Sequence, residues 1–215
     1  MLTVKHAIIR VEGTRLLTLD SLTVGAGEII TLLGPSGIGK STLLKCLAGL
    51  QDPEVGFEGT ITLQGRDLSP LPAHKRQIGY VDQRPILFPH LNVSQNLSFG
   101  LRQSCRMERT TQIEQALKTA NLSAFAKADV ATLSGGQAAR VALMRTLLSD
   151  PQALLLDEPF AAFDPALRTS IRDFVFGQVR ALGRPTLLVT HDREDAAAAK
   201  GPIFTLENQT LLPQV

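Results

Sequence analysis

The sequence lacks any long hydrophobic run, and its positive and negative charges nearly balance. No stretch of the 215 residues approaches the roughly 18 consecutive apolar residues that a membrane-spanning helix needs. The first ten residues alternate between apolar and polar side chains, as in a strand, and lack the apolar core of a signal peptide. A net charge of +2 gives no reason to expect a nucleic-acid partner. If the protein acts at a membrane, we therefore expect another protein to hold it there.

Cysteine is also scarce. The two cysteines, Cys46 and Cys105, do not have the spacing of a metal site. We expect Cys46 to be a small buried apolar residue, and a reducing cytosol is the natural compartment for such a chain. The rest of the composition, 44% hydrophobic and 20% charged, is ordinary for a soluble globule. At this length we expect one large domain, or a domain with a subdomain, with a substantial core.

One stretch of the sequence predicts a phosphate site. It matches the pattern G-x-x-x-x-G-K-[ST] without a mismatch, and its residues are Gly34, Pro35, Ser36, Gly37, Ile38, Gly39, Lys40, Ser41 and Thr42. A buried strand is predicted before it over 28–33, and a helix after it over 41–48. In this context the glycines let backbone N–H groups converge on an anion at a helix N-terminus. Lys40 then reaches the β- and γ-phosphates and Ser41 ligates Mg²⁺, so we predict that the chain binds a nucleoside triphosphate.

A second phosphate-handling element follows an apolar strand. Asp157 stands at the carboxyl end of this strand, where a carboxylate holds Mg²⁺ directly or through water. Glu158 comes next and is predicted to orient or deprotonate the attacking water. An acidic pair after a strand is common, and it is often only the start of a loop. The intact phosphate loop in the same chain favours the functional interpretation.

A third element begins at Ser134 and opens a helix that is predicted to run to about Leu148. The spacing from Ser134 to Gln137 is that of a capping box, which is a purely structural feature. Gly135 and Gly136 speak against structure alone, because each glycine weakens a helix by up to about 1 kcal/mol relative to alanine. They make sense if a phosphate approaches this helix start. One nucleotide does not obviously fill two helix starts in one subunit, so we expect a composite site between two subunits.

The order of the predicted elements indicates an α/β protein. Short alternating strands fill residues 2–33, and further strands are expected at 59–65 and 77–81. From about residue 92 to residue 149 the pattern is helical, apart from a polar, loosely patterned piece at 103–109. The α/β pattern then returns with a buried strand at 153–156, a helix at 166–182, a buried strand at 186–190 and a helix at 192–200 that Gly201 and Pro202 end. Parallel strands with crossover helices bind ligands at the carboxyl ends of the strands.

In their order along the chain, these motifs resemble the ATP-binding subunits of ATP-binding-cassette (ABC) transporters. The phosphate loop, Leu133–Gln137, Leu154–Glu158 and His191 carry the resemblance, which covers nearly the whole chain. It implies the ABC ATPase fold, an α/β fold in which a P-loop NTPase core carries an N-terminal antiparallel β-subdomain and an inserted α-helical subdomain.

The resemblance also implies a domain division. Residues 1–215 are expected to form a single ABC ATPase domain. Within it, residues 1–85 and 150–215 are expected to form the β-subdomain and the core, and residues from about 86 to 149 the helical subdomain.

Further roles come from the resemblance rather than from local pattern. Gln83 matches the glutamine that touches Mg²⁺ and links the site to the helical subdomain. Asp164, which a proline follows, matches the loop between the nucleotide sites, although this pair is also an ordinary helix start. His191 matches the switch histidine that contacts the γ-phosphate. Two identical subunits are expected to close head to tail over two ATP, with Lys40 of one facing Ser134 of the other.

The chain departs from the family at the nucleotide base. The family usually places an aromatic ring in the N-terminal β-region to stack on adenine, but this chain has no Phe, Tyr or Trp before Phe57. Val11 is nearest to that position, and His6 is the only ring nearby. Base–aromatic stacking contributes roughly 1–3 kcal/mol, so we expect weaker or less base-selective ATP binding.

The segment LFPHLNVSQNLSFG at 87–100 resembles import-type subunits of bacteria, which serve thiamine, sulfate, molybdate, iron or polyamines. There it forms the groove for a helix of the membrane permease, although its apolar residues also suit a core. The leading hypothesis is the ATPase of a bacterial importer, peripheral on the cytoplasmic side of the inner membrane, with permease subunits and a solute-binding protein as partners. The alternatives are a soluble ABC ATPase in repair, iron–sulfur assembly or translation, and a small GTPase or kinase. The last is disfavoured by the signature and by the lack of an Asn-Lys-x-Asp guanine reader.

Overall fold

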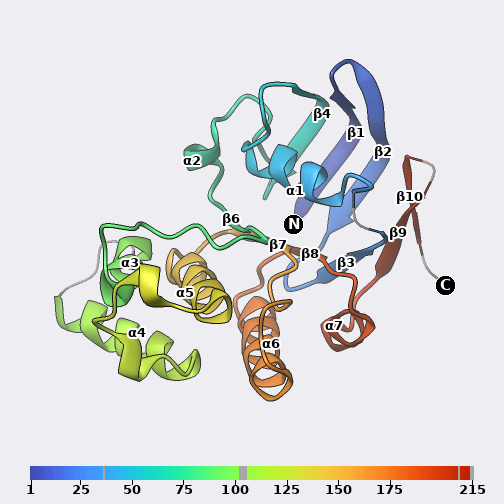
Figure 1. Ribbon diagram of the computed structural model, residues 1–215. Coiled ribbons are helices and arrows are strands. Elements are labelled where there is room, and N and C mark those ends of the chain that lie inside the picture. Colours follow the sequence, from blue (N-terminus) through green and yellow to red (C-terminus); the bar gives the residue numbers. More distant parts are fainter. Residues whose placement is uncertain (36, 102–105, 208, 214–215) are drawn as a thin grey trace. The chain divides into compact units, whose positions relative to one another are not determined.

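The computed structural model describes residues 1–35, 37–101, 106–207 and 209–213 (Figure 1). The chain forms two compact units. Unit 1 comprises Met1–Tyr80, Gln152–Glu158 and Val175–Val215, and unit 2 comprises Val81–Pro151 and Pro159–Phe174. The domain division expected from the sequence stays a prediction.

A ten-stranded sheet with the order β5-β4-β1-β2-β10-β9-β3-β8-β7-β6 organises unit 1. Its first part is antiparallel and consists of β1 (Leu2–Val11), β2 (Thr14–Val24), β4 (Val55–Leu63) and β5 (Arg66–Asp67). The turn between β1 and β2 is made by Glu12 and Gly13, both at positive φ, as a two-residue type I′ hairpin requires. The strands β1, β2 and β4 supply apolar residues to one core with α1.

The second part of the sheet is parallel and almost wholly apolar. It consists of β3 (Ile29–Leu33), β7 (Ala153–Asp157), β8 (Thr186–Val189) and β9 (Ile203–Glu207), with β3 between β8 and β9. The continuous burial of β7 and β8 is typical of strands covered on both faces. β6 (Ile78–Val81) lies beside β7, and β10 (Thr210–Pro213) runs antiparallel to β9.

Helix α1 (Lys40–Ala48) follows β3 (Figure 1). It buries Leu43, Leu44 and Leu47 in the core of unit 1. Cys46 is fully buried in the same face, as expected for a small apolar residue. The helix ends at Gly49, which adopts φ 75°. Arg76, at the end of α2 (Ala73–Arg76), donates to the carbonyls of Cys46 and Leu47 and so satisfies two acceptors at the helix end.

Two further helices flank the parallel strands. α6 (Pro165–Ala181) contributes Pro165–Phe174 to unit 2 and its remainder to unit 1. α7 (Arg193–Ala199) packs near β3 and ends at Lys200, which has the left-handed φ of 51°. Gly201 follows, and a Cβ on this residue would collide with the carbonyl of Ile29. The glycine is therefore needed for close approach to β3, whereas the sequence predicted only a helix stop.

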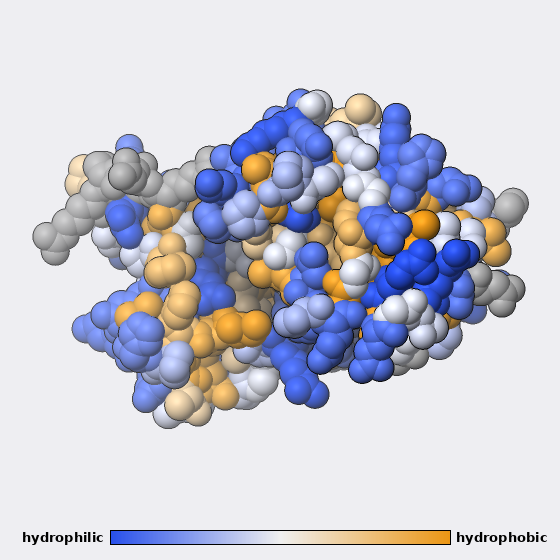
Figure 2. All heavy atoms as spheres, turned by 90° about the horizontal axis from the view of Figure 1, so that it is seen from above, coloured by the Kyte–Doolittle hydropathy of each residue, from blue (hydrophilic) through white to orange (hydrophobic). Residues whose placement is uncertain are grey.

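Unit 2 is helical and contains α3 (Val93–Gly100), α4 (Arg106–Thr119) and α5 (Gly135–Leu148), with short 3-10 turns at Ser123–Phe125 and Val130–Thr132. α3 packs against α5, and a Cβ on Gly100 would collide with the carbonyl of Arg145. Figure 2 shows hydrophobic residues at the surface of this unit. Its exposed large hydrophobic side chains include Ile86, Phe99 and Met107.

The predicted fold class is confirmed, and the differences concern short segments. The strands β9 and β10 were not predicted. The polar piece expected at 103–109 ends inside a helix, because α4 begins at Arg106; residues 102–105, with Cys105, lie outside the described residues. In the described part of the chain, no helix is both long and apolar enough to span a membrane.

Candidate functional site

The phosphate loop joins β3 to α1. The backbone φ angles of Gly34, Gly37 and Gly39 are 145°, 82° and 105°, values that residues other than glycine rarely adopt. A Cβ on Gly39 would also lie 3.0 Å from Cδ2 of Leu16, so the residue is held closely from β2. Ser36 lies outside the described residues. The glycines of the pattern thus occupy backbone conformations that favour glycine, and the loop leads into the N-terminus of α1.

Lys40 is the first residue of α1 and is only 7% exposed. Its Nζ donates to the carbonyl oxygens of Gly34 and Pro35, each at 2.7 Å. Burial lowers the pKa of the lysine, while the charges of Glu158 and Asp157 act in the opposite direction. These two carbonyls stand in for the phosphate oxygens that we propose as the partners of Lys40.

Asp157 and Glu158 follow β7 as predicted. Asp157 is 2% exposed, and the hydroxyl of Tyr80 on β6 donates to its Oδ2 at 3.4 Å. Glu158 has φ 49°, an uncommon value for a residue with a side chain, and its N–H donates to the carbonyl of Val189 on β8. That hydrogen bond ties the backbone of Glu158 to the end of the neighbouring strand.

His191 follows β8 and lies against Glu158. Its Nδ1 is 2.8 Å from Oε1 of Glu158, and the side chains of His191 and Glu158 are 70% and 12% exposed. The residues on both sides of His191 are fixed. The Thr190 hydroxyl accepts from the N–H of Asp192 at 3.0 Å and donates to the buried carboxylate of Asp195 at 3.4 Å.

Unit 1 thus brings four predicted residues to the carboxyl ends of adjacent parallel strands. Lys40 comes after β3, and His191 comes after β8. Asp157 is the last residue of β7, and Glu158 follows it. Ligands bind at this edge in open α/β sheets. The grouping offers a buried cation, a buried carboxylate and a carboxylate with an adjacent imidazole, which suits a phosphate ester and an attacking water.

Ser134 and Gln137 lie in unit 2 and form a complete capping box at the start of α5. The Ser134 Oγ accepts from the Gln137 N–H at 3.3 Å, and the Gln137 Oε1 accepts from the Ser134 N–H at 2.8 Å. The structural interpretation of this spacing therefore holds. It leaves the Ser134 hydroxyl hydrogen for another acceptor, because the cap uses only the oxygen as an acceptor.

The two glycines of this helix start differ from each other. A Cβ on Gly135 would meet nothing within 4 Å, whereas one on Gly136 would lie 2.6 Å from the carbonyl oxygen of Ala162. Close backbone approach therefore explains Gly136 within one copy of the chain. Nothing within this copy explains Gly135.

Arg140 was missed by the sequence analysis. Its guanidinium donates to the carbonyls of Gly136 and Ala120, so it joins the first turn of α5 to the end of α4. Burial lowers its pKa, and the charge of Asp164 opposes this. Asp164 caps α6 by accepting from the N–H of Leu167 at 3.1 Å. No local sequence signal distinguishes Arg140 from other helix arginines, since its partner Ala120 lies in another segment.

Two predicted residues, Gln83 and Val11, belong to other segments of the chain than these groups. Gln83 is exposed two residues after β6, in unit 2. Val11 is half-buried at the end of β1, opposite Thr14 and Val55. Tyr80, which contacts Asp157, was also missed. Strand alternation could have placed it on a face of β6, but not beside Asp157.

Comparison with protein families gives a match to the family described as ABC transporter over residues 17–161. An uncharacterized ABC transporter ATP-binding protein of Escherichia coli, YnjD, is 44% identical over 199 residues, which are 92% of each protein. The spermidine/putrescine import ATP-binding protein PotA of Bacteroides fragilis is 39% identical over 86% of this chain and 40% of its own length. The sulfate/thiosulfate import ATP-binding protein CysA of Nephroselmis olivacea is 43% identical over 91% of this chain and 56% of its own length. The chain thus spans less than two thirds of these two import proteins.

Solved structures give the same result. The dimeric post-hydrolysis state of the ATP-binding cassette MJ0796, bound to ADP and Pi, matches with a TM-score of 0.87 and 28% identity, covering 100% of this chain and 98% of that one. A dimeric structure of MJ0796 as a bacterial ABC transporter cassette matches with a TM-score of 0.85, 29% identity, and coverage of 98% and 96%.

Proposed function

The chain belongs to the ABC transporter family, whose ATP-binding cassettes are ATPases, and on that premise we propose that it powers the import of a small solute across the bacterial cytoplasmic membrane. The contact of 2.8 Å between Glu158 and His191 carries the proposal. It pairs a carboxylate with an imidazole beside the phosphate loop, in the same unit as Lys40. We propose that Glu158 deprotonates or orients the attacking water, while His191 and Lys40 contact the γ-phosphate.

The residues present fit Mg²⁺ bound together with ATP. Ser41 offers a hydroxyl and Asp157 a buried carboxylate, which are the hard oxygen ligands that this ion takes alongside substrate phosphates. In the described part of the chain, no group of three acidic, histidine or cysteine residues is placed so that it could hold a metal ion. Bound there, Mg²⁺ would neutralise developing negative charge on the phosphates. Gln83 is proposed as a further ligand.

We propose that the complete site forms between two copies of the chain. Ser134, Gly135, Gly136 and Gln137 of one copy would receive the γ-phosphate held by Lys40 of the other, with Asp164 near the boundary. The dimeric MJ0796 structures support this arrangement, since one of them contains ADP and Pi. The free hydroxyl hydrogen of Ser134 and the open space at Gly135 support it from this chain. ATP then favours the closed dimer because only the closed dimer contacts it from both sides.

The partner outside the dimer is proposed to be a membrane permease, together with a solute-binding protein. The chain would then lie on the cytoplasmic face of the membrane. PotA and CysA are import ATP-binding proteins and support this proposal. So does the surface of unit 2, where Phe99 is 66% exposed and its ring lies against the half-buried Phe88, tilted by 57° with ring centroids 4.4 Å apart. An exposed aromatic side chain of this kind suits a docking helix.

The substitution Glu158→Gln tests the proposal. It removes the general base but keeps the size of the side chain, so ATP should bind and remain unhydrolysed. We expect ATP turnover to fall by at least about 100-fold, and a stable dimer to appear in gel filtration with ATP. Glu194→Gln, an exposed residue of α7, serves as the matched control. Full turnover in Glu158→Gln would overturn the assignment of the base.

The second candidate is a soluble ABC ATPase with a role outside transport. The match to YnjD over nearly its full length leaves room for it, because that protein is uncharacterized. Purification of the tagged chain from native membranes in mild detergent decides between the two. A permease that copurifies in stoichiometric amount supports the importer. A chain that stays out of the membrane fraction, with no membrane partner, supports the soluble role.

A further inference from the structure

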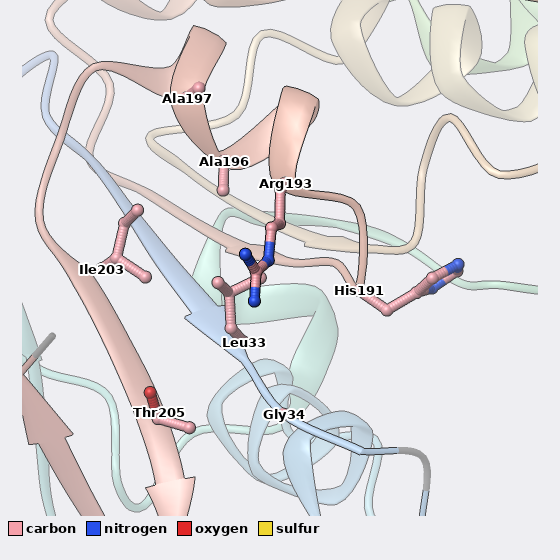
Figure 3. Close-up of a pocket in the computed structure, with 8 residues that line it drawn as sticks. All are labelled: Leu33, Gly34, His191, Arg193, Ala196, Ala197, Ile203 and Thr205. Atoms are coloured by element: carbon pink, nitrogen blue, oxygen red, sulfur yellow. The ribbon is translucent and has the colours of Figure 1, made fainter.

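A cavity of about 760 Å³ opens in unit 1 beside the segment that carries His191 (Figure 3). Its walls come from the end of β3, from α7 and from β9. Among the described residues, none from Gly37 to Thr42 lines it, and neither Asp157 nor Glu158 does. The cavity therefore adjoins the phosphate site, with which it shares Gly34 and His191, and extends away from it between α7 and β9. Its volume lies within the range of about 300–1,000 Å³ that small-molecule sites occupy.

About half of the wall is apolar. Leu33 lies at the end of β3, Ala196 and Ala197 lie on one side of α7, and Ile203 lies on β9. Thr205 follows two residues after Ile203, so both side chains project from the same face of β9. Thr205 adds a hydroxyl to this wall. A ligand with an apolar body and a polar group would match this combination.

The charge in the cavity has one sign. Arg193 lines it and is exposed, and its side chain has no hydrogen bond or ion pair to any described residue. Figure 3 shows its guanidinium reaching from the start of α7 toward Leu33, while the ring of His191 turns away from the other lining residues. No described acidic residue lines the cavity. Asp192 is engaged nearby, where its carboxylate accepts from two N–H groups of α7. The guanidinium thus offers its donors to an anion.

We propose that this cavity binds a small organic anion with an apolar body, either a carboxylate or a phosphate monoester, and that its binding slows ATP hydrolysis. Arg193 follows His191 by two residues, and the cavity touches both. A ligand held by Arg193 restrains the segment from Thr190 to Arg193 and hence the placement of His191 against Glu158. The binding part stands on the cavity alone, whereas the inhibition rests on the proposed function.

Binding is tested with anilinonaphthalene sulfonate, a fluorescent probe that joins a sulfonate to an apolar ring system. The purified chain without nucleotide should bind it saturably. Arg193→Gln should weaken this binding at least about tenfold, the loss expected for one charge-assisted contact. Ala197→Phe fills the cavity from an exposed position and should abolish binding. Ala197→Ser leaves the space open and Lys5→Gln removes a distant exposed charge, so both controls should bind as the wild type does.

Three outcomes overturn the binding site. These are equal probe binding by wild type and Ala197→Phe, displacement of the probe by MgADP, and failure of both benzoate and phenyl phosphate to displace it. Displacement by benzoate alone identifies a carboxylate site, and displacement by phenyl phosphate alone a phosphate ester site.

Inhibition is measured separately. Saturating probe should lower kcat for ATP in the wild type and leave Ala197→Phe unaffected. Equal kcat with and without bound probe overturns the regulatory part. A wild-type chain without ATPase activity would contradict the proposed function instead, while the binding result would remain.

Discussion

Lys40 shows how a single residue is prepared for a ligand. A buried ammonium group is unfavourable, and burial accordingly lowers its pKa. Two loop carbonyls compensate this in part at 2.7 Å each. Phosphate oxygens carry more negative charge than carbonyl oxygens, so we expect the loop to gain more from binding an anion than from keeping its own contacts. The positive φ of Gly34, Gly37 and Gly39 lets the loop take this conformation without strain.

Val11 allows a test at the nucleotide base. It lies half-buried at the end of β1, and no aromatic residue precedes Phe57. We expect Val11→Tyr to tighten ATP binding by about tenfold, because base stacking is worth roughly 1–3 kcal/mol. Val11→Leu adds volume without a ring and should change little. Titration of each variant with ATP and with GTP measures this. Strong preference for ATP over GTP in the wild type would contradict the expectation.

Cys46 gives a prediction about pH. Burial raises its pKa to about 11, with Arg76 acting in the opposite direction. At pH 8 only about one thiol in a thousand is then ionised, and the side chain is inaccessible. In a Cys105→Ser background we expect iodoacetamide to leave the native protein unlabelled and to label it in urea. Because the folded pKa lies above 9.0, ionisation opposes folding, so stability should fall as pH rises past that value. Rapid labelling of the native protein would contradict the burial of this thiol.

The site residues that could be predicted from sequence are those whose partners lie close to them along the chain. Gly34 to Thr42 form one loop and one helix start, so their roles depend on local structure. Tyr80 and Arg140 were missed because their partners lie far along the chain. The contact of Glu158 with His191 spans 33 positions. Each residue was predicted separately, but their hydrogen bond depends on the neighbouring placement of β7 and β8.

At the scale of an element, the start of α5 combines two demands. Its capping box satisfies free backbone N–H groups at the helix start, and its two glycines leave the first two helical positions without side chains. Gly136 approaches the carbonyl of Ala162, which lies two residues before Asp164. Arg140 donates a hydrogen bond to the carbonyl of Gly136 in the same turn, and the charge of Asp164 raises the pKa of its guanidinium against the effect of burial. The helix start and the segment before α6 are thus one packed arrangement within unit 2.

The two glycines should respond differently to the same substitution. Gly136→Ala forces a methyl against a backbone carbonyl at 2.6 Å and should lower the free energy of unfolding by about 1–3 kcal/mol. Gly135→Ala meets open space and should leave stability equal or raise it by up to about 1 kcal/mol. Urea unfolding of both variants measures the difference. Equal destabilisation by the two substitutions would contradict the close approach.

The elements missed from sequence are those that depend on neighbours. β9 and β10 are short, and β10 pairs with β2 at a single position. Neither strand has a strong pattern of its own, so their existence depends on the edge that β3 offers to β9 and on the pairing of β10 with β9 and β2. The fully buried strands were predicted because burial on two faces leaves a continuous apolar run, and the amphipathic helices because burial on one face leaves a periodic pattern.

At the scale of the whole molecule, the predicted site residues fall into two sets. Lys40, Asp157, Glu158 and His191 belong to unit 1, whereas Ser134 and Asp164 belong to unit 2. A head-to-tail dimer with twofold symmetry would build each ATP site from unit 1 of one copy and unit 2 of the other. Hydrolysis would then be a property of the pair and would respond to the concentration of the chain.

Mixing two inactive variants tests this dependence. Lys40→Ala removes the phosphate-binding cation. Gly135→Glu points into open space in its own copy, so it should fold normally, yet it places a negative charge where the other copy would bring phosphate. Each variant alone should be inactive. In a mixed dimer, the Lys40 of the Gly135→Glu copy faces the intact Ser134 segment of the Lys40→Ala copy, so one of its two sites is whole. With random pairing we expect recovery of about a quarter of wild-type ATPase activity, because half of the dimers would carry one whole site. Gly135→Ala provides the control for the charge, and a mixture as inactive as its components would contradict the composite site.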